Sequence, residues 1–387
     1  MNFQLTDDHR ELLAALRTFC EKEIAPRAEQ RDQAGRFEDG LIPQLAELGL
    51  FGLYVPAEHG GAGLDILSYV AAVEELSRAC AATGILVSAH TSLCVDPIMT
   101  YGNDAQRAKY LPKLSTGEWI GAFSITEPGS GSDAGAARCR AELKSDGWHV
   151  TGTKCFVTNA REAHVIILFA VSDPDDRKHR LTAFILERGM PGWRVGKIEK
   201  KLGIRASSTG ELIFEDCVIP VANQLGERGR GLRIALSTLD GGRLGVAAQA
   251  VGIAQAALDA SLGYSKTRRQ FNRPIADFQA IQWKLADMVT GISAARLLTR
   301  YGAWLKQNGR PFATIAGMAK LLASEVAARS TSAAVQTFGG YGYVCDYPVE
   351  RYFRDAKITE LYEGTSEIQR LTIARALVAD PDWIKRG

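Results

Sequence analysis

The sequence predicts an α+β protein in three parts: an N-terminal α-helical domain over residues 1–117, a middle β domain over 118–226 and a C-terminal four-helix bundle over 227–387. Three observations lead to this fold class. Apolar residues recur at helical spacing in the first and last parts. Between them the period changes to two, with no helices between the strands, which is typical of a small antiparallel barrel or sandwich. The 387 residues, 46% of them hydrophobic, are enough for two or three domains.

The first part reads as successive helices. Thr6, with His9 three residues later, is a plausible helix start, and apolar residues then recur at helical spacing until Pro26. A turn-rich loop follows at 55–63. Further helices are predicted at 41–50, 68–78 and 83–101.

The middle part reads as short strands. Residues 137–143 alternate with period two, and Asp146-Gly147 is a hairpin turn. The predicted strands are 119–126, 137–143, 148–151, 156–158, 165–171, 181–186 and 211–214.

The last part is helical again. Residues 243–262 carry almost no charge, so this helix should be buried on most faces, with Leu239 to Arg243 at its head. Helices are also predicted at 278–307 and, after Pro311, at 312–337. Ser366 and Gln369 have the spacing of a capping box that opens the final helix, which completes a bundle of four.

Charge and cysteine usage exclude several classes of function. The chain has 46 basic and 44 acidic side chains, interspersed, so no patch favours nucleic acid or a membrane surface. Seven scattered cysteines predict free thiols in a reducing compartment, and the six histidines lack metal-ligand spacing, so no metal is expected. The N-terminal residues do not look like a leader, and no run of about 18 apolar residues exists. We expect a cytoplasmic protein, or one of the mitochondrial matrix if a leader has been removed.

Glu363 is the candidate catalytic residue. It stands in a short turn, where Gly364 supplies backbone freedom, just before the final helix. A carboxylate held against an apolar ligand is partly desolvated, which raises its pKa toward the range of a general base at neutral pH.

The segment 351–370 around Glu363 resembles the C-terminal signature of the acyl-CoA dehydrogenases, and the resemblance recurs from about residue 3 to about residue 380. The run 88–93 and the segment 239–257 are most similar to short-chain, butyryl-type members. The resemblance implies FAD-dependent oxidation of an acyl-CoA to a trans-2-enoyl-CoA in fatty acid β-oxidation. Glu363 would remove the pro-R α-proton while hydride passes to flavin N5. The Glu363 N–H and a flavin hydroxyl would polarise the thioester oxygen.

The glycine-rich stretch 126–134 matches the G-x-G-x-x-A fingerprint of nicotinamide enzymes, but a strand follows it where that motif needs a helix. It resembles the flavin loop of the acyl-CoA dehydrogenases instead. Phe156 and Thr158 match an aromatic-x-Thr flavin triplet in which many members carry Trp, so Phe156 can pack on the flavin but cannot donate a hydrogen bond. By resemblance the flavin contacts here are Phe123, Ile125, Thr126, Gly131, Ser132, Phe156 and Thr158, with Thr365 and Glu367 beyond the turn.

Other positions follow from the same resemblance. Arg268, Phe271 and Gln279 would reach the flavin pyrophosphate of a neighbouring subunit, and Gln336, Gly339 and Gly340 would approach its nucleotide. The substrate contacts would be Ser132, Asp240, Arg243 and Gly364. A homotetramer that passes electrons to an electron-transferring flavoprotein is implied as well. His90 is predicted as a packed side chain, and 201–209 as a loop near the cleft.

Three alternatives remain at this point. The same scaffold could use oxygen as acceptor, as an oxidase does, or could act on acyl groups attached to a carrier protein. From a different class, it could be a flavin-containing nucleic-acid binder, although the basic patch that such a protein needs is missing.

Overall fold

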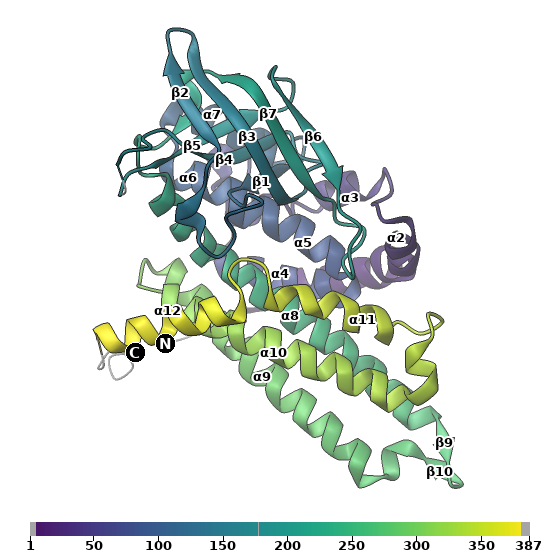
Figure 1. The fold of residues 1–387 in the computed structure, drawn as a ribbon. Coiled ribbons are helices and arrows are strands. Elements are labelled where there is room, and N and C mark those ends of the chain that lie inside the picture. The colour runs from purple at the N-terminus through teal and green to yellow at the C-terminus, as the bar shows by residue number, and fades with distance from the viewer. Residues whose placement is uncertain (1–4, 177, 381–387) are drawn as a thin grey trace.

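The computed structural model describes residues 5–176 and 178–380. Figure 1 shows a twisted sheet above, a group of N-terminal helices beside it, and long C-terminal helices below. The predicted order of helical, β and helical parts is therefore confirmed. The outermost residues of the predicted first and last domains, 1–4 and 381–387, lie outside the described residues.

The N-terminal part is a set of helices that follow one another closely. Thr6 caps the first helix by accepting a hydrogen bond from the His9 N–H at 3.3 Å, as predicted. Pro26 does not end the helical run, because it occupies an early position of a new 3₁₀ turn, where proline loses no hydrogen bond. The elements are α1 (Asp7–Phe19), η1 (Cys20–Ile24), η2 (Ala25–Arg27), α2 (Ala28–Ala34), α3 (Leu41–Glu47), η3 (Ala57–His59), α4 (Ile66–Ala79), α5 (Ala81–His90), η4 (Thr91–Val95), α6 (Asp96–Tyr101) and α7 (Asp104–Ser115).

The middle part is one sheet with the order β6-β7-β3-β2-β4-β5-β8, and β1 pairs with β4. Its end strands do not pair with each other among the described residues, so the sheet is sandwich-like and not a closed barrel. Most pairs are antiparallel, but β1 and β2 each pair with β4 in parallel. The strands are β1 (Gly121–Ser124), β2 (Arg140–Lys144), β3 (Gly147–Thr158), β4 (Val165–Val171), β5 (Leu181–Glu187), β6 (Trp193–Ile198), β7 (Thr209–Ile219) and β8 (Gln224–Leu225), with short 3₁₀ turns η5 (Ala134–Ala136) and η6 (Val221–Asn223).

The C-terminal part contains the long helices α8 (Gly231–Thr267), α9 (Gln279–Gln307) and α10 (Ala313–Phe338), then α11 (Val349–Ala356) and α12 (Ser366–Ala379). The prediction that residues 239–243 open the buried helix was wrong, because α8 already begins at Gly231. Asp240 and Arg243 therefore project from the middle of a helix. The short elements are β9 (Arg269–Gln270), β10 (Arg273–Pro274), η7 (Ile275–Asp277), η8 (Gly339–Tyr343) and η9 (Lys357–Glu360).

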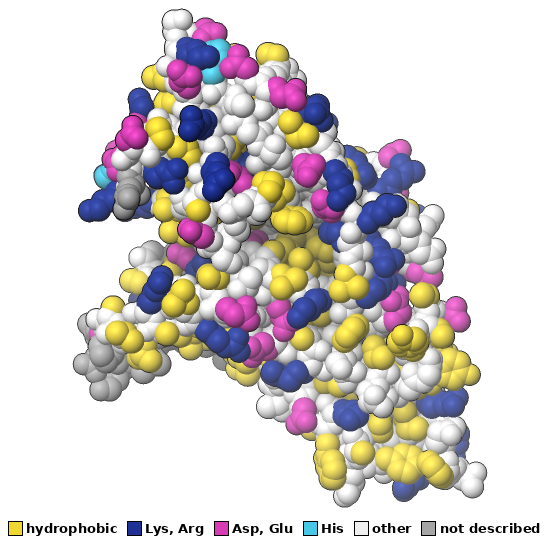
Figure 2. All heavy atoms as spheres, viewed as in Figure 1, with side chains coloured by type: hydrophobic (Ala, Val, Ile, Leu, Met, Phe, Trp, Pro, Cys, Tyr) yellow, Lys and Arg dark blue, Asp and Glu magenta, His cyan; other side chains and the backbone are white. Residues whose placement is uncertain are grey.

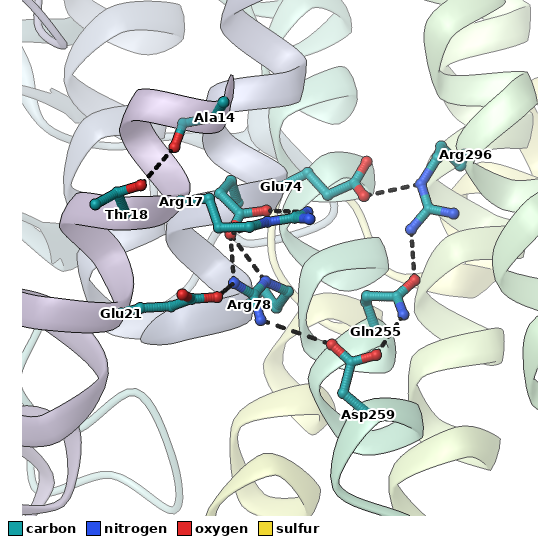
Figure 3. Close-up of polar contacts among 10 residues, drawn as sticks. Ala14, Arg17, Thr18, Glu21, Glu74, Arg78, Gln255, Asp259 and Arg296 are labelled. Atoms are coloured by element: carbon teal, nitrogen blue, oxygen red, sulfur yellow. Dashed lines mark hydrogen bonds and ion pairs between the residues drawn. The ribbon is translucent and has the colours of Figure 1, made fainter. Parts of the chain in front are cut away.

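A network of ion pairs joins the N-terminal helices to the C-terminal bundle (Figure 3). Buried Glu75 of α4 accepts from Arg17 of α1 at 3.0 Å and from Arg78 at 2.6 Å. Arg78 lies 3.6 Å from Asp259 of α8, and Glu74 pairs with Arg296 of α9 at 2.8 Å. Because the network spans α1, α4, α8 and α9, it fixes the orientation of α8, which carries one wall of the site described next.

Candidate active site

A cavity of about 670 Å³ opens where the sheet meets the helices. Figure 2 shows hydrophobic side chains gathered in a hollow at this junction. Its walls come from α5, β1 and the loop after it, β3, the loop 199–209, α8 and the turn between α11 and α12. The loop 201–209, expected near the cleft, does supply one edge. A mostly apolar cavity with a few polar groups is the usual form of a small-molecule site.

Glu363 stands in the turn between η9 and α12 and lines this cavity. Its φ of +53° and that of Gly364, +93°, make the sharp backbone reversal. The Gln369 amide donates to the carbonyls of Glu363 and Gly364 at 3.1 and 2.9 Å, and Lys320 Nζ of α10 donates to the Gly364 carbonyl at 2.7 Å. The turn is therefore held by two helices.

The predicted capping box of Ser366 and Gln369 was wrong. Thr365 is the N-cap of α12, and its hydroxyl accepts from the Ile368 N–H at 3.4 Å. Gln369 is fully buried and uses its amide on the turn instead. A capping box needs the third residue to reach back to the N-cap N–H, and here the two carbonyls of the strained turn take that donor.

The Glu363 carboxylate is placed to titrate near neutrality. Its Oε2 is shielded from solvent and has no hydrogen-bond partner among the described residues. Burial raises the pKa of Glu363 to about 7, against the opposing effect of the positive charges of Lys320 and Arg243. Gly242 of α8 lies against the carboxylate, and a Cβ there would overlap Oε2 and come within 2.8 Å of Leu93 Cδ2. Glycine at 242 leaves the room that the Glu363 carboxylate occupies.

Arg243 and Asp240 form an ion pair at 2.5 Å, one turn apart on α8. Arg243 is buried and lines the cavity, with its Nε unpartnered among the described residues. Burial raises the pKa of Asp240. Asp240 does not line the main cavity; it borders a smaller, more open and basic pocket beside it, with Lys178, Arg230 and Arg233.

A second wall of the main cavity contains several of the residues predicted to contact a flavin, which come from β1, the loop after it and β3. Phe156 is 63% exposed at φ +56°, with its ring presented at the cavity edge. A flat aromatic ring system could pack on such a face, with hydroxyls at its rim. Phe123, Ile125, Thr126, Gly131, Ser132, Phe156 and Thr158 all line the same cavity, as do Gly364 and Thr365.

A buried ion pair that sequence reasoning missed holds the glycine-rich loop. Lys154 Nζ, fully buried in β3, donates to Glu127 Oε1 at 2.7 Å and to the Ile125 carbonyl at 3.0 Å. Glu127 also accepts from the N–H groups of Arg138 and Cys139 at 2.6 and 3.0 Å. Both ends of the loop are thus tied to one carboxylate, which leaves Gly131 and Ser132 at the cavity.

Seven other predicted residues are not brought to this cavity. They lie mostly exposed, near the ends of α8 and α10 and the starts of α9 and α12; Phe271 is 87% exposed, and Arg268 stacks on Tyr341 with 5.3 Å to the ring centroid. Apart from the glycine and its neighbours in sequence, no atom of the described residues lies within 4 Å of a Cβ built at Gly339 or Gly340. The residues are Arg268, Phe271, Gln279, Gln336, Gly339, Gly340 and Glu367.

His90 has the packed role expected of it. It is fully buried, and its Nδ1 accepts from the Gly121 N–H at 2.9 Å. Burial lowers its pKa to about 3, so it is neutral. It supports β1 from behind and does not line the cavity.

Sequence reasoning also missed Lys320, which is fully buried in α10. A lone lysine inside the apolar run 315–323 was a usable signal, because lysine is almost never fully buried without a partner. Across the described residues, no cluster of metal-ligating side chains forms and no helix is long and apolar enough to cross a membrane.

Three family models match the chain: "Acyl-CoA dehydrogenase, N-terminal domain" over residues 6–118, the middle domain over 122–217 and the C-terminal domain over 229–378. A short-chain specific acyl-CoA dehydrogenase of Clostridium acetobutylicum is 48% identical, over 97% of this chain and 99% of that protein. The solved butyryl-CoA dehydrogenase of Megasphaera elsdenii is 48% identical with a TM-score of 0.96, over 98% and 100% of the two chains. A chain solved in work on the electron transferring flavoprotein of Acidaminococcus fermentans is 50% identical with a TM-score of 0.97, over 98% and 100%.

Proposed function

The chain belongs to the acyl-CoA dehydrogenase family, and we propose that it oxidises short-chain acyl-CoA thioesters at the α,β bond to trans-2-enoyl-CoA, with Glu363 as the base. The single observation that carries the assignment of the base is the Glu363 carboxylate. It lies in the apolar cavity with a free oxygen and a pKa near 7. A base with such a pKa works at the pH of the cell.

FAD is the cofactor of this family, and when bound it accepts the hydride that leaves the β carbon. The wall that contains Phe156 fits it. The exposed aromatic face suits a flat ring system, and the hydroxyls of Thr126, Thr158 and Ser132 suit its polar rim and the start of its phosphate chain.

The chain's own residues account for the proton. Glu363 Oε2 takes the α-proton, whose acidity rises when the thioester oxygen is polarised by the N–H of Glu363 itself. Arg243, buried beside the base, compensates the negative charge that the carboxylate carries before the reaction. The apolar lining excludes water, which strengthens each of these interactions.

The test is a visible spectrum of the purified holoenzyme, recorded without oxygen before and after butyryl-CoA is added. We expect bleaching of the oxidised flavin band in the wild-type protein. Glu363→Gln should keep its flavin and lose the bleaching, because an amide cannot take the proton. Glu360→Gln is the matched control: Glu360 belongs to the same segment and pairs with Lys357 at 2.7 Å, but its own side chain does not line the cavity, so this variant should still bleach.

A flavin that stays oxidised with butyryl-CoA and with longer and branched thioesters would overturn the proposal and redirect the search to carrier-bound substrates. Rapid reoxidation of the bleached flavin in air would favour the oxidase alternative. Chain length follows from the same assay with thioesters of increasing length, and the rate should be highest for the short ones.

Assembly and partners form a further part of the proposal. The residues predicted to reach a flavin nucleotide, Arg268 among them, do not line the cavity of their own chain, which supports a homotetramer in which they serve a neighbour. We propose an electron-transferring flavoprotein as acceptor, a cytoplasmic location, and domain limits near residues 117 and 226. Co-purification with such a flavoprotein tests the acceptor, and sedimentation of the holoenzyme tests the homotetramer.

A further inference from the structure

Lys320 is a buried cation that the reaction above leaves without a role. Its side chain is fully enclosed in α10. Burying an ammonium group costs several kcal/mol unless hydrogen bonds and opposite charge offset the loss of water. The groups that contact Lys320 therefore indicate what offsets the cost of its burial.

Lys320 donates a hydrogen bond to the active-site turn. Nζ donates to the Gly364 carbonyl at 2.7 Å, and the Gln369 amide donates to the same oxygen at 2.9 Å. Gln369 also holds the Glu363 carbonyl at 3.1 Å. Two helices, α10 and α12, thus hold the two peptide groups that orient the base.

The turn needs this support because its conformation is unfavourable. Glu363 is a non-glycine residue at φ +53°, which costs on the order of 1–2 kcal/mol. Without the hydrogen bonds to its carbonyls, the backbone could relax, and the carboxylate would then leave its place against Gly242. Misplacement of a reacting group by about 1 Å can cost a hundredfold in rate.

We propose that Lys320 is a positioning residue: by fixing the Gly364 carbonyl from behind, it holds the turn in the conformation that directs the Glu363 carboxylate into the cavity. The inference rests on the proposed function, since it concerns Lys320 only as the support of the base.

The charge of Lys320 adds a second effect. It faces Glu363 on the turn, Arg243 on α8, Glu360 on η9 and Glu367 on α12, while Glu363 is faced by Lys320 and Arg243. Burial lowers the pKa of Lys320 to about 8, so it is mostly charged at neutral pH. Because its positive charge lowers the pKa of Glu363, removing it must raise that pKa.

The experiment compares Lys320→Met, which removes donor and charge at similar length, with Lys320→Gln, which keeps an N–H donor without charge. Flavin content, melting temperature, kcat, KM and the pH profile of kcat/KM are measured for butyryl-CoA. Arg329→Met is the matched control. It removes an exposed cation of the same helix, whose ion pair with Glu325 is 3.9 Å long, and should leave every readout unchanged.

For Lys320→Met we expect retained flavin, a KM within about threefold of wild type, a kcat lower by about tenfold or more, and an acid limb at higher pH. Lys320→Gln should recover part of kcat but keep the shifted limb. Unchanged kcat and pH profile in Lys320→Met would overturn the inference, as would a loss of activity fully explained by lost flavin. If Lys320→Met does not fold, the same two readouts on Lys320→Gln decide. Wild-type bleaching that survives Glu363→Gln would instead overturn the proposed function.

Discussion

At the scale of single residues, the pH dependence of the rate should report Glu363. Its pKa is raised to about 7 from an ordinary value of 4.5, and the base must be ionised to take a proton. We therefore expect kcat/KM for butyryl-CoA to rise with pH through an apparent pKa near 7 and to be low at pH 5.5. A rate that is constant from pH 5.5 to 8.5 would contradict the burial of the base.

The raised pKa of Glu363 also affects the stability of the fold. The stability contributed by this group should fall as pH rises, whereas the rate should increase. A carboxyl group whose pKa is higher in the folded than in the unfolded state stabilises the fold below pH 4.5, and this stabilisation is lost as pH rises through 7. Glu363→Gln removes this loss, at most about 3 kcal/mol. The melting temperature of Glu363→Gln relative to wild type should increase between pH 5 and 8. An equal difference at both pH values would speak against the raised pKa.

Gly242 should be as sensitive as the base itself. A Cβ at this position would overlap Glu363 Oε2, so Gly242→Ala must displace the carboxylate. We expect kcat/KM to fall by about a hundredfold while flavin is retained. Gly263→Ala on the same helix is the control, because, apart from the adjacent backbone of its own helix, no atom of the described residues lies within 4 Å of its added Cβ. That change should keep activity and, as a helix-favouring substitution, should not lower the melting temperature. Similar activity in the two variants would contradict the close contact.

At the scale of elements, the glycine-rich loop depends on one buried ion pair. Lys154→Met leaves Glu127 buried with two backbone N–H donors and no cation, which should cost about 3–5 kcal/mol. The loop that carries Gly131 and Ser132 should loosen, so FAD affinity should fall, as measured by titrating the apoprotein with FAD. Lys144→Met is the control within the same sheet, since its pair with Asp216 is long and exposed. Equal FAD affinity in the two variants would mean that the ion pair does not hold the loop.

The bounds of individual strands and helices show which elements the sequence predicts well and which it does not. Residues 165–171 were predicted at their exact limits, because a fully buried strand is a continuous apolar run. Strand β3 is predicted as two separate strands, 148–151 and 156–158, because Gly152 and Lys154 interrupt the alternation of its apolar residues. The prediction places the start of α8 too late because Asp240, Gly241 and Gly242 interrupt the apolar pattern, and glycines inside a helix are unfavourable and are more usual in turns.

The site was less predictable than the fold for a related reason. Glu363 and the residues predicted to contact a flavin could be named by resemblance, and Phe156 and Thr158 do line the same cavity as Glu363. The partners that hold the base could not be named, because Lys320 and Gly364 are 44 positions apart and only packing of α10 under the turn brings them together. No local pattern encodes a contact of that kind.

At the scale of the whole molecule, substitutions near the ends of α8 and α10 test whether one copy of the chain completes the flavin site of another. Arg268 and Phe271 lie outside their own chain's cavity, so the proposed assembly lets them serve a neighbour's flavin. Arg268→Ala alone should weaken flavin retention, whereas Arg269→Ala, which changes the adjacent arginine bonded to the Asn272 carbonyl, should not. The flavin-to-protein ratio after gel filtration measures this. Equal ratios would exclude a role for Arg268.

Mixed assemblies show whether Arg268 contacts the flavin of a neighbouring chain or the flavin of its own chain. In a co-expressed mixture of Arg268→Ala and Glu363→Gln chains, the first keeps its own Glu363 and can receive Arg268 from the second. If Arg268 acts across the interface, the Arg268→Ala chain of a mixed pair regains flavin and with it activity, because one complete site forms per mixed pair. If Arg268 acts within its own chain, the Arg268→Ala site stays as poor in flavin as in its parent, and the site that keeps flavin lacks the base. Butyryl-CoA activity per Arg268→Ala chain, measured without added FAD on the separated mixed assembly and on the Arg268→Ala parent, distinguishes the two arrangements.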